Sequence, residues 1–132
     1  MDLITVTRKA GMAFEVRVRG HRLDCDMSVA DGGHGEGFSP AELFAGTLGA
    51  CVAMMAQRYL DESGNGKGDV AVSVVLEMAD APKRVASLVV DLELPEGVPE
   101  NRETAIRRVV EQGVIYETLR RTPEVDVDIQ FN

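Results

Sequence analysis

The chain has 132 residues, 45% of them hydrophobic and 27% charged, which predicts one globular domain over residues 1–132. Its formal net charge of −8 argues against a nucleic-acid or anionic-membrane partner, because phosphate binding needs clustered Lys and Arg. The longest apolar run, residues 43–56, is shorter than the ~20 residues that span a bilayer, and the N-terminus has no signal-peptide pattern. We therefore expect a cytoplasmic protein whose two cysteines are reduced.

The first three predicted elements are strands over residues 2–8, 13–19 and 21–28. In the second strand Phe14, Val16 and Val18 alternate with charged residues, which predicts one buried face. A Gly-rich loop, "DGGHGEG", follows the third strand. The two histidines, His21 and His34, are too few and too far apart for a metal site, so we expect neither a metal nor another cofactor.

The next predicted element is a long helix. Ser39-Pro40-Ala41-Glu42 is a capping box, with Ser at the N-cap and Glu at the third helical position, and the helix should run from Pro40 to about Asp61. Apolar residues cover all its sides, so we expect this helix to be buried all round. In so small a domain, a dimer that covers the helix from both sides would achieve this.

The second half of the chain predicts two strands, a helix and a last strand. Strands over 69–79 and 84–94 form an antiparallel hairpin, and a helix over about 100–119 is weakened at Gly113, where it would divide. A final strand over 124–131 alternates apolar and polar residues. The order βββ-α-ββ-α-β indicates an α+β fold with antiparallel sheets around the central helix.

Cys51 lies within the long apolar helix. The pattern alone favours a small buried hydrophobe, because free cysteines are among the most buried residues. A reactive cysteine would work as the thiolate, and the helix dipole has faded this far from the N-terminus. A nearby cation would then have to stabilise the thiolate, supplied by Arg8, Lys9, Arg17, Arg58 or a residue of a partner chain.

Three stretches resemble the OsmC/Ohr family of osmotically induced and organic-hydroperoxide-resistance proteins: "VRGHRLDCDMSVADGG", "FSPAELFAGTLGAC" and "ETLRRTPEVDVDI". The resemblance covers essentially the whole chain and implies an intertwined homodimer whose two cysteine-bearing helices pack centrally. It also implies thiol-dependent reduction of organic hydroperoxides in the oxidative stress response. In that activity a first cysteine attacks the O–O bond, a second resolves the sulfenic acid as a disulfide, and dihydrolipoyl groups or other dithiols reduce it.

The resemblance assigns residues to this chemistry. Cys51 matches the first cysteine, but the second, counted back from Leu119, falls on Gly113. Arg8 or Lys9 lies in the region of the thiolate-stabilising arginine, and Glu42 would orient that cation. Glu42 also has a purely structural explanation as the capping partner of Ser39.

Two further features complete the expected site. Cys25 alternates with Leu23 and Met27, which favours a buried strand residue, yet it is the only other cysteine that could resolve Cys51 within one chain. An apolar wall for an alkyl substrate would come from the long helix, through Phe44, Thr47, Leu48, Met54 and Met55.

Two functions follow from the sequence. The first is a one-cysteine peroxidase that acts on a small-molecule hydroperoxide and depends on an external thiol reductant. The second is a non-catalytic homodimer that binds an apolar small molecule or a partner, peroxidase turnover having been lost with the resolving cysteine.

Overall fold

A computed structural model describes residues 2–132 of the chain. Two compact units divide it. The first comprises the residues up to Gly46 together with Val74–Val89, and the second comprises Thr47–Ser73 together with Val90–Asn132. The α+β class with antiparallel sheets is confirmed.

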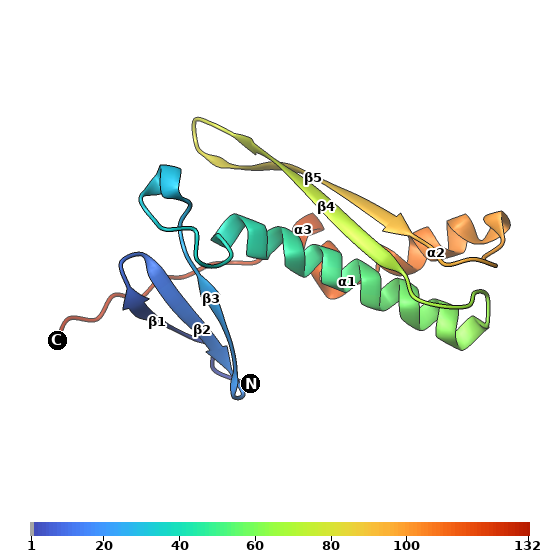
Figure 1. Cartoon of the computed structure of the whole chain (residues 1–132), viewed down its shortest axis with the longest axis horizontal. Helices are drawn as coiled ribbons and strands as arrows, with labels where there is room; N and C mark the ends of the chain where they lie inside the picture. The colour runs from blue at the N-terminus through green and yellow to red at the C-terminus, as the bar shows by residue number, and fades with distance from the viewer. Residues whose placement is uncertain (1) are drawn as a thin grey trace. The chain divides into compact units, whose positions relative to one another are not determined.

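The first unit contains a three-stranded antiparallel sheet in the order β1-β2-β3, with β1 at Thr5–Ala10, β2 at Ala13–Val18 and β3 at His21–Cys25 (Figure 1). Val16 lies opposite Val6 on one side and Leu23 on the other, so apolar side chains line up across the three strands. The register shifts between Arg8 and Ala10, which marks a bulge next to the β1–β2 turn.

The loop after β3 is organised by a buried carboxylate. Only 3% of Asp26 is exposed, and its oxygens accept hydrogen bonds from the backbone N–H groups of Met27 (2.7 Å), Glu36 (3.1 Å) and His34 (3.2 Å). β3 therefore ends at Cys25, earlier than predicted, because Asp26 turns from strand pairing to the loop. The loop includes a short 3-10 helix, η1, at Val29–Asp31.

The central helix, α1, runs over Pro40–Ser63. A single stripe of it is buried, made of Ala45, Leu48, Val52, Ala56 and Leu60 at spacings of three and four residues. One chain alone does not bury α1 all round, since Phe44 is 39% and Met54 69% exposed, and its coverage by a dimer stays a prediction. Nothing within the described chain covers that side of α1 fully.

β4 at Ala71–Ala79 and β5 at Arg84–Glu93 form a two-stranded sheet, and the predicted hairpin is confirmed. Val72, Val74 and Leu76 are half-buried on β4, while the intervening Val75 is 61% exposed. This alternation of half-buried and exposed side chains shows that one face of the two-stranded sheet is covered and the other is open to solvent.

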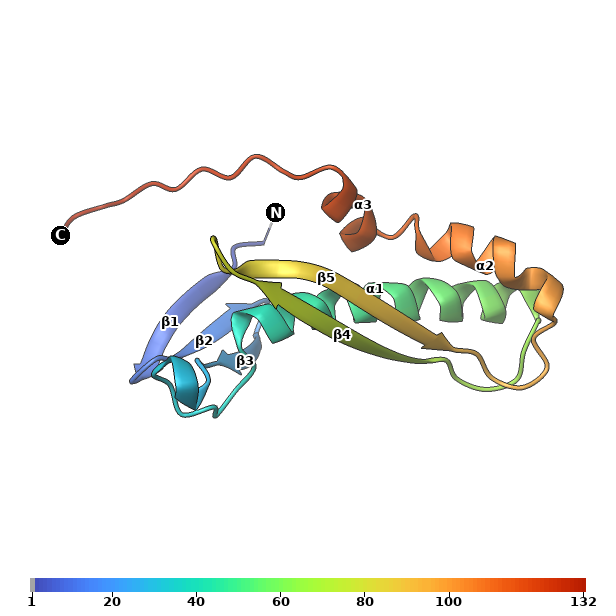
Figure 2. The same cartoon turned by 90° about the horizontal axis from the view of Figure 1, so that it is seen from above.

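The predicted second helix divides at Gly113. A 3-10 turn, η2, at Glu100–Arg102 leads into α2 at Glu103–Val110, and α3 follows at Val114–Arg120 (Figure 2). Gly113 has extended backbone angles (φ −65°, ψ 150°), which ends the helical path, and its carbonyl accepts from the Glu117 N–H at the start of α3.

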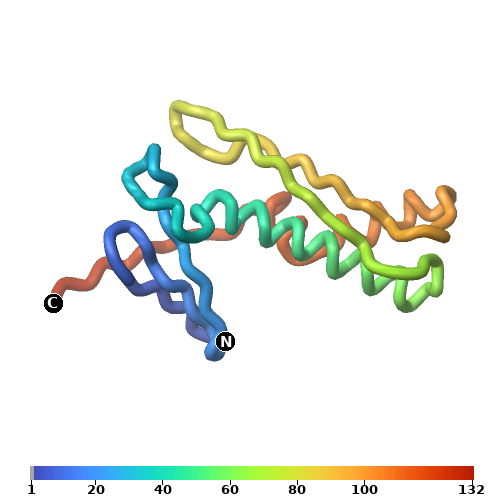
Figure 3. The backbone as a smooth tube through the Cα atoms, in the orientation of Figure 1, coloured from blue at the N-terminus to red at the C-terminus, as the bar shows by residue number. Residues whose placement is uncertain are grey.

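The predicted last strand, 124–131, is not a strand in the structure. After α3 the backbone runs on as an extended trace without a strand neighbour (Figure 3). The alternating side chains are largely exposed: Val125 and Val127 by 80%, Ile129 by 76% and Phe131 by 92%. The sequence has the strand pattern, but a strand forms only where another strand accepts its hydrogen bonds.

Candidate functional site

Cys51 lies on α1 in the second unit, and its side chain is half-buried and free. Gly113, which belongs to the same unit, is a close neighbour of Cys51. A Cβ atom added to Gly113 would lie 2.5 Å from the Cys51 sulfur and 3.4 Å from Cγ of Met55. The turn between α2 and α3 therefore packs its bare backbone against the thiol, and a side chain at position 113 would require the Cys51 sulfur to shift.

The geometry of this pair is close to that of a disulfide. Across a disulfide, each Cβ lies about 3 Å from the opposite sulfur, as its bond lengths dictate. The separation of 2.5 Å at Gly113 is a few tenths of an ångström shorter. A side chain at position 113 would thus start within bonding reach of Cys51, but Gly113 offers no thiol.

The expected apolar wall is only partly assembled around Cys51. Met55 lies beside the same turn as the sulfur, while Leu48 belongs to the buried stripe of α1. Met54 and Thr47 are exposed, and Phe44 belongs to the first unit. The role of these side chains in substrate binding stays a prediction.

Glu42 forms the predicted capping box, which is confirmed in both directions. The Glu42 N–H donates to the Ser39 hydroxyl at 3.1 Å, and the Ser39 N–H donates to the Glu42 carboxylate at 2.9 Å. Hydrogen bonds from the Ser39 backbone and side chain lower the pKa of Glu42, so the carboxylate is charged at neutral pH. The capping contact fully accounts for its placement, and an orienting role stays a prediction.

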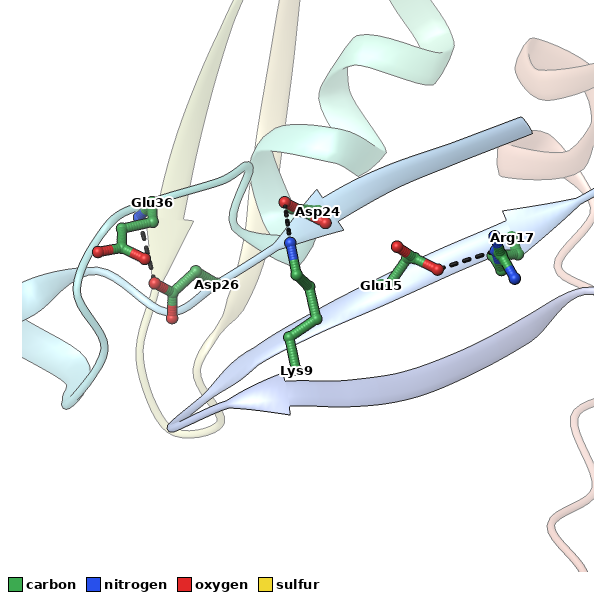
Figure 4. Close-up of polar contacts among 6 residues, drawn as sticks. All are labelled: Lys9, Glu15, Arg17, Asp24, Asp26 and Glu36. Carbon is green, nitrogen blue, oxygen red and sulfur yellow. Dashed lines mark hydrogen bonds and ion pairs between the residues drawn. The ribbon is translucent and has the colours of Figure 1, made fainter. Parts of the chain in front are cut away.

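Arg8 and Lys9 lie beside the β1–β2 turn of the first unit. Nε of Arg8 donates to the Gly11 carbonyl at 2.8 Å, and Nζ of Lys9 pairs with the Asp24 carboxylate at 2.8 Å (Figure 4). The hydrogen bond and charge of Asp24 raise the pKa of Lys9. Asp24 thus offsets the positive charge of Lys9, while the one partner of the Arg8 guanidinium among residues 2–132 is a carbonyl.

Cys25 ends β3, where its backbone bridges to Phe38, and its side chain is half-buried and free. This agrees with a structural strand residue. Its proposed role as a resolving thiol stays a prediction.

The sequence reasoning missed Asp26. Its neighbour in the loop, Glu36, donates the backbone N–H shown in Figure 4. The signal was present as an aspartate shortly before the Gly-rich stretch 31–37, a combination that lets backbone N–H groups converge on one carboxylate. Glu36, His34 and Met27 hydrogen bonds together lower the pKa of Asp26 against the opposing effect of its burial.

Residues 33–128 match the family model described as OsmC-like protein. The chain belongs to the OsmC-like protein family. The match extends over most of the chain and includes both Cys51 and Gly113. No curated protein sequence matches the chain.

Solved structures share the OsmC fold. A Psychrobacter arcticus protein, provisionally described as an osmotic stress induced and detoxification response protein, superposes with a TM-score of 0.82 at 18% identity, over 89% of this chain and 88% of that one. An OsmC-like protein from Mycoplasma pneumoniae gives 0.78 at 14% identity, over 92% and 89%. The organic hydroperoxide resistance protein OsmC of Legionella pneumophila gives 0.67 at 20% identity, over 92% and 90%.

No helix within residues 2–132 has the length and apolarity to cross a membrane, and no group of three or more His, Cys, Asp or Glu residues in this range could hold a metal ion.

Proposed function

We propose that this OsmC-like protein reduces organic hydroperoxides through Cys51 and depends on an external thiol to complete the cycle. One observation carries the proposal. The sulfur of Cys51 lies against position 113, the position that the family resemblance gives to the resolving cysteine. The chain keeps the spatial pairing and lacks one of the two thiols.

The first step consumes one hydroperoxide. The Cys51 thiolate attacks the distal oxygen of the O–O bond, which breaks and leaves the alcohol after a proton is taken up. Cys51 becomes a sulfenic acid, so sulfur is oxidised by two electrons and the peroxide is reduced by two.

The second step needs two external thiols. The first condenses with the sulfenic acid, releasing water and forming a mixed disulfide with Cys51. The second attacks that disulfide, which regenerates the Cys51 thiol and releases an external disulfide. Gly113 cannot supply either thiol, because it has no side chain.

The protein acts, in this proposal, as a cytoplasmic homodimer. Support comes from two exposed apolar features: the uncovered side of α1, where Met54 is 69% exposed, and the unpaired segment 124–131. A second copy that supplied a neighbouring strand would turn the latter into the strand its alternation predicts. Light scattering at micromolar concentration tests this, and a monomer would contradict it.

Arg8 is the proposed thiolate-stabilising cation, because Lys9 already pairs with Asp24. Glu42 would orient it. Replacement Arg8→Met should slow alkylation of Cys51 by iodoacetamide at pH 7, whereas Lys9→Met should have a smaller effect. Equal rates in both variants and the parent chain would remove Arg8 from the mechanism.

The test of the function is mass spectrometry of the reduced protein after one equivalent of cumene hydroperoxide in the presence of dimedone. We expect a dimedone adduct on Cys51, absent from Cys51→Ser and unchanged in Cys25→Ser. A Cys25–Cys51 disulfide would instead identify Cys25 as the resolving thiol. A free Cys51 thiol under excess peroxide would overturn the proposal.

The absence of a thiol at Gly113 favours one alternative, a non-catalytic dimer that binds an apolar molecule or a partner. In it the cavity around Cys51 holds the apolar molecule, and it predicts that peroxide does not modify Cys51.

A further inference from the structure

The second unit contains a cleft of about 340 Å³ that Cys51 does not line. β5 and the residues just after it form one side, α2 and α3 form the other, and Val52 of α1 contributes to the lining. Its volume lies in the range of small-molecule sites, at the lower end.

The cleft has an apolar floor. Val52 and Ile106 are both 4% exposed, and the half-buried Val90, Leu92 and Val110 continue the same surface. Such a lining favours a hydrocarbon chain or ring, which would gain about 25 cal/mol for each Å² of apolar surface removed from water.

The rim of the cleft is charged. Two carboxylates, Glu103 and Glu111, and one guanidinium, Arg107, line it, which gives two negative charges against one positive. None of these three side chains forms an ion pair or hydrogen bond with another residue in 2–132, so the rim charges are available to a ligand. A cationic group at the mouth would be attracted and a carboxylate repelled.

We infer that this cleft is a second binding site, separate from Cys51, for a small amphipathic cation: a primary amine that carries an alkyl or aryl group. The apolar part would lie on Val52 and Ile106, and the ammonium group would lie among the rim carboxylates. Tyr116, which is half-buried in the lining, extends the apolar surface, while the Arg120 guanidinium lies over its ring, 5.8 Å from the centroid.

The test measures the binding of octylamine, octanol and octanoate to the full chain, by calorimetry and by changes in amide chemical shifts. The three probes share one tail and differ in head-group charge. We expect octylamine to bind most tightly and octanoate most weakly, with shifts concentrated on residues 103–111. Raising the salt concentration should weaken the amine selectively, because exposed charges are screened.

Variants at the rim locate the site. Glu103→Gln and Glu111→Gln should each raise the dissociation constant for octylamine about threefold, as expected for one exposed charge pair, and leave octanol binding unchanged. Glu62→Gln is the matched control, because it removes the same charge from an exposed residue of the same unit outside the lining. It should leave the dissociation constant unchanged.

Three outcomes would overturn the inference: no binding of octylamine, octanoate binding as tightly as octylamine, or an equal loss of affinity in Glu62→Gln. None of them depends on peroxide chemistry, so the site and the proposed peroxidase activity fail or stand separately.

Discussion

The start of α1 and its middle position their functional candidates by different means. At the start, Glu42 and Ser39 exchange two hydrogen bonds at the surface. In the middle, the Cys51 sulfur is placed by contact with a bare backbone at Gly113. Hydrogen bonds at a surface tolerate small movements and compete with water, whereas close packing does not. Close packing against Gly113 therefore restricts the position of the Cys51 thiol more tightly than the capping hydrogen bonds restrict Glu42.

The largest expected effect comes from filling the space at position 113. Gly113→Val places a side chain in contact with the Cys51 sulfur and Met55, and overpacking of this kind costs about 1–3 kcal/mol in the free energy of unfolding. Chemical denaturation measures the change.

The rescue for that variant is Cys51→Ala. Removing the sulfur clears the nearest atom, so the double variant should recover part of the lost stability and retain the part due to Met55. Additive losses in the double variant would show that Cys51 and position 113 are not in contact.

The next effect concerns the loop organised by Asp26. Backbone hydrogen bonds lower the pKa of Asp26 below its ordinary value of 3.8, so this carboxylate stabilises the folded state at neutral pH. The contribution is complete above about pH 5 and is lost as pH falls through the lowered pKa. Asp26→Asn should melt earlier than the parent chain at pH 7, and the two melting curves should converge in acid.

A matched control separates the pH-dependent stabilisation by Asp26 from a general effect of removing one negative charge. Asp69 is exposed, and its side chain forms no hydrogen bond or ion pair among residues 2–132. Asp69→Asn should leave the pH dependence of melting unchanged. If it behaves like Asp26→Asn, the loop hydrogen bonds are not the cause.

Removing the cap of α1 should cost less than filling position 113. Ser39→Ala loses the hydroxyl that accepts the Glu42 N–H, and N-cap replacements of this kind cost about 1 kcal/mol. A double-mutant cycle with Glu42→Ala, which removes the acceptor of the Ser39 N–H, measures the reciprocal bond. A cycle without coupling would mean that the two side chains act independently.

The smallest effect is expected at the most exposed contact. Lys9 and Asp24 pair at 2.8 Å, but their side chains are 49% and 42% exposed. Lys9→Met should leave the melting temperature unchanged within error, because exposed ion pairs contribute little after screening. A clear drop would show that this pair stabilises the sheet.

Local patterns predicted much of the fold. The capping box, the β4–β5 hairpin and the division of the second helix at Gly113 all depend on neighbouring residues, and all three are found. The last strand was predicted from alternation alone, which does not reveal whether a neighbouring strand exists. The burial of α1 on all sides stays a prediction for the same reason: the composition of a helix does not say what covers it.

For the candidate site too, some features could be predicted from the sequence and others could not. The resemblance to known proteins paired Cys51 with position 113, a contact between distant residues that no spacing in the chain reveals, and the two lie together. The cleft beside α2 was missed, because it combines residues from separate segments of the chain. The hydrogen bonds of Asp26 come from a single loop, and their signal was overlooked.

The proposed function makes Cys51 a redox thiol whose missing partner belongs at position 113. Intact mass and thiol titration of Gly113→Cys after one equivalent of cumene hydroperoxide test this, with Gly113→Ser as control. We expect rapid formation of a disulfide between Cys51 and the introduced thiol, with loss of two free thiols, and no disulfide in the control. Persistence of both thiols in a folded variant would contradict it.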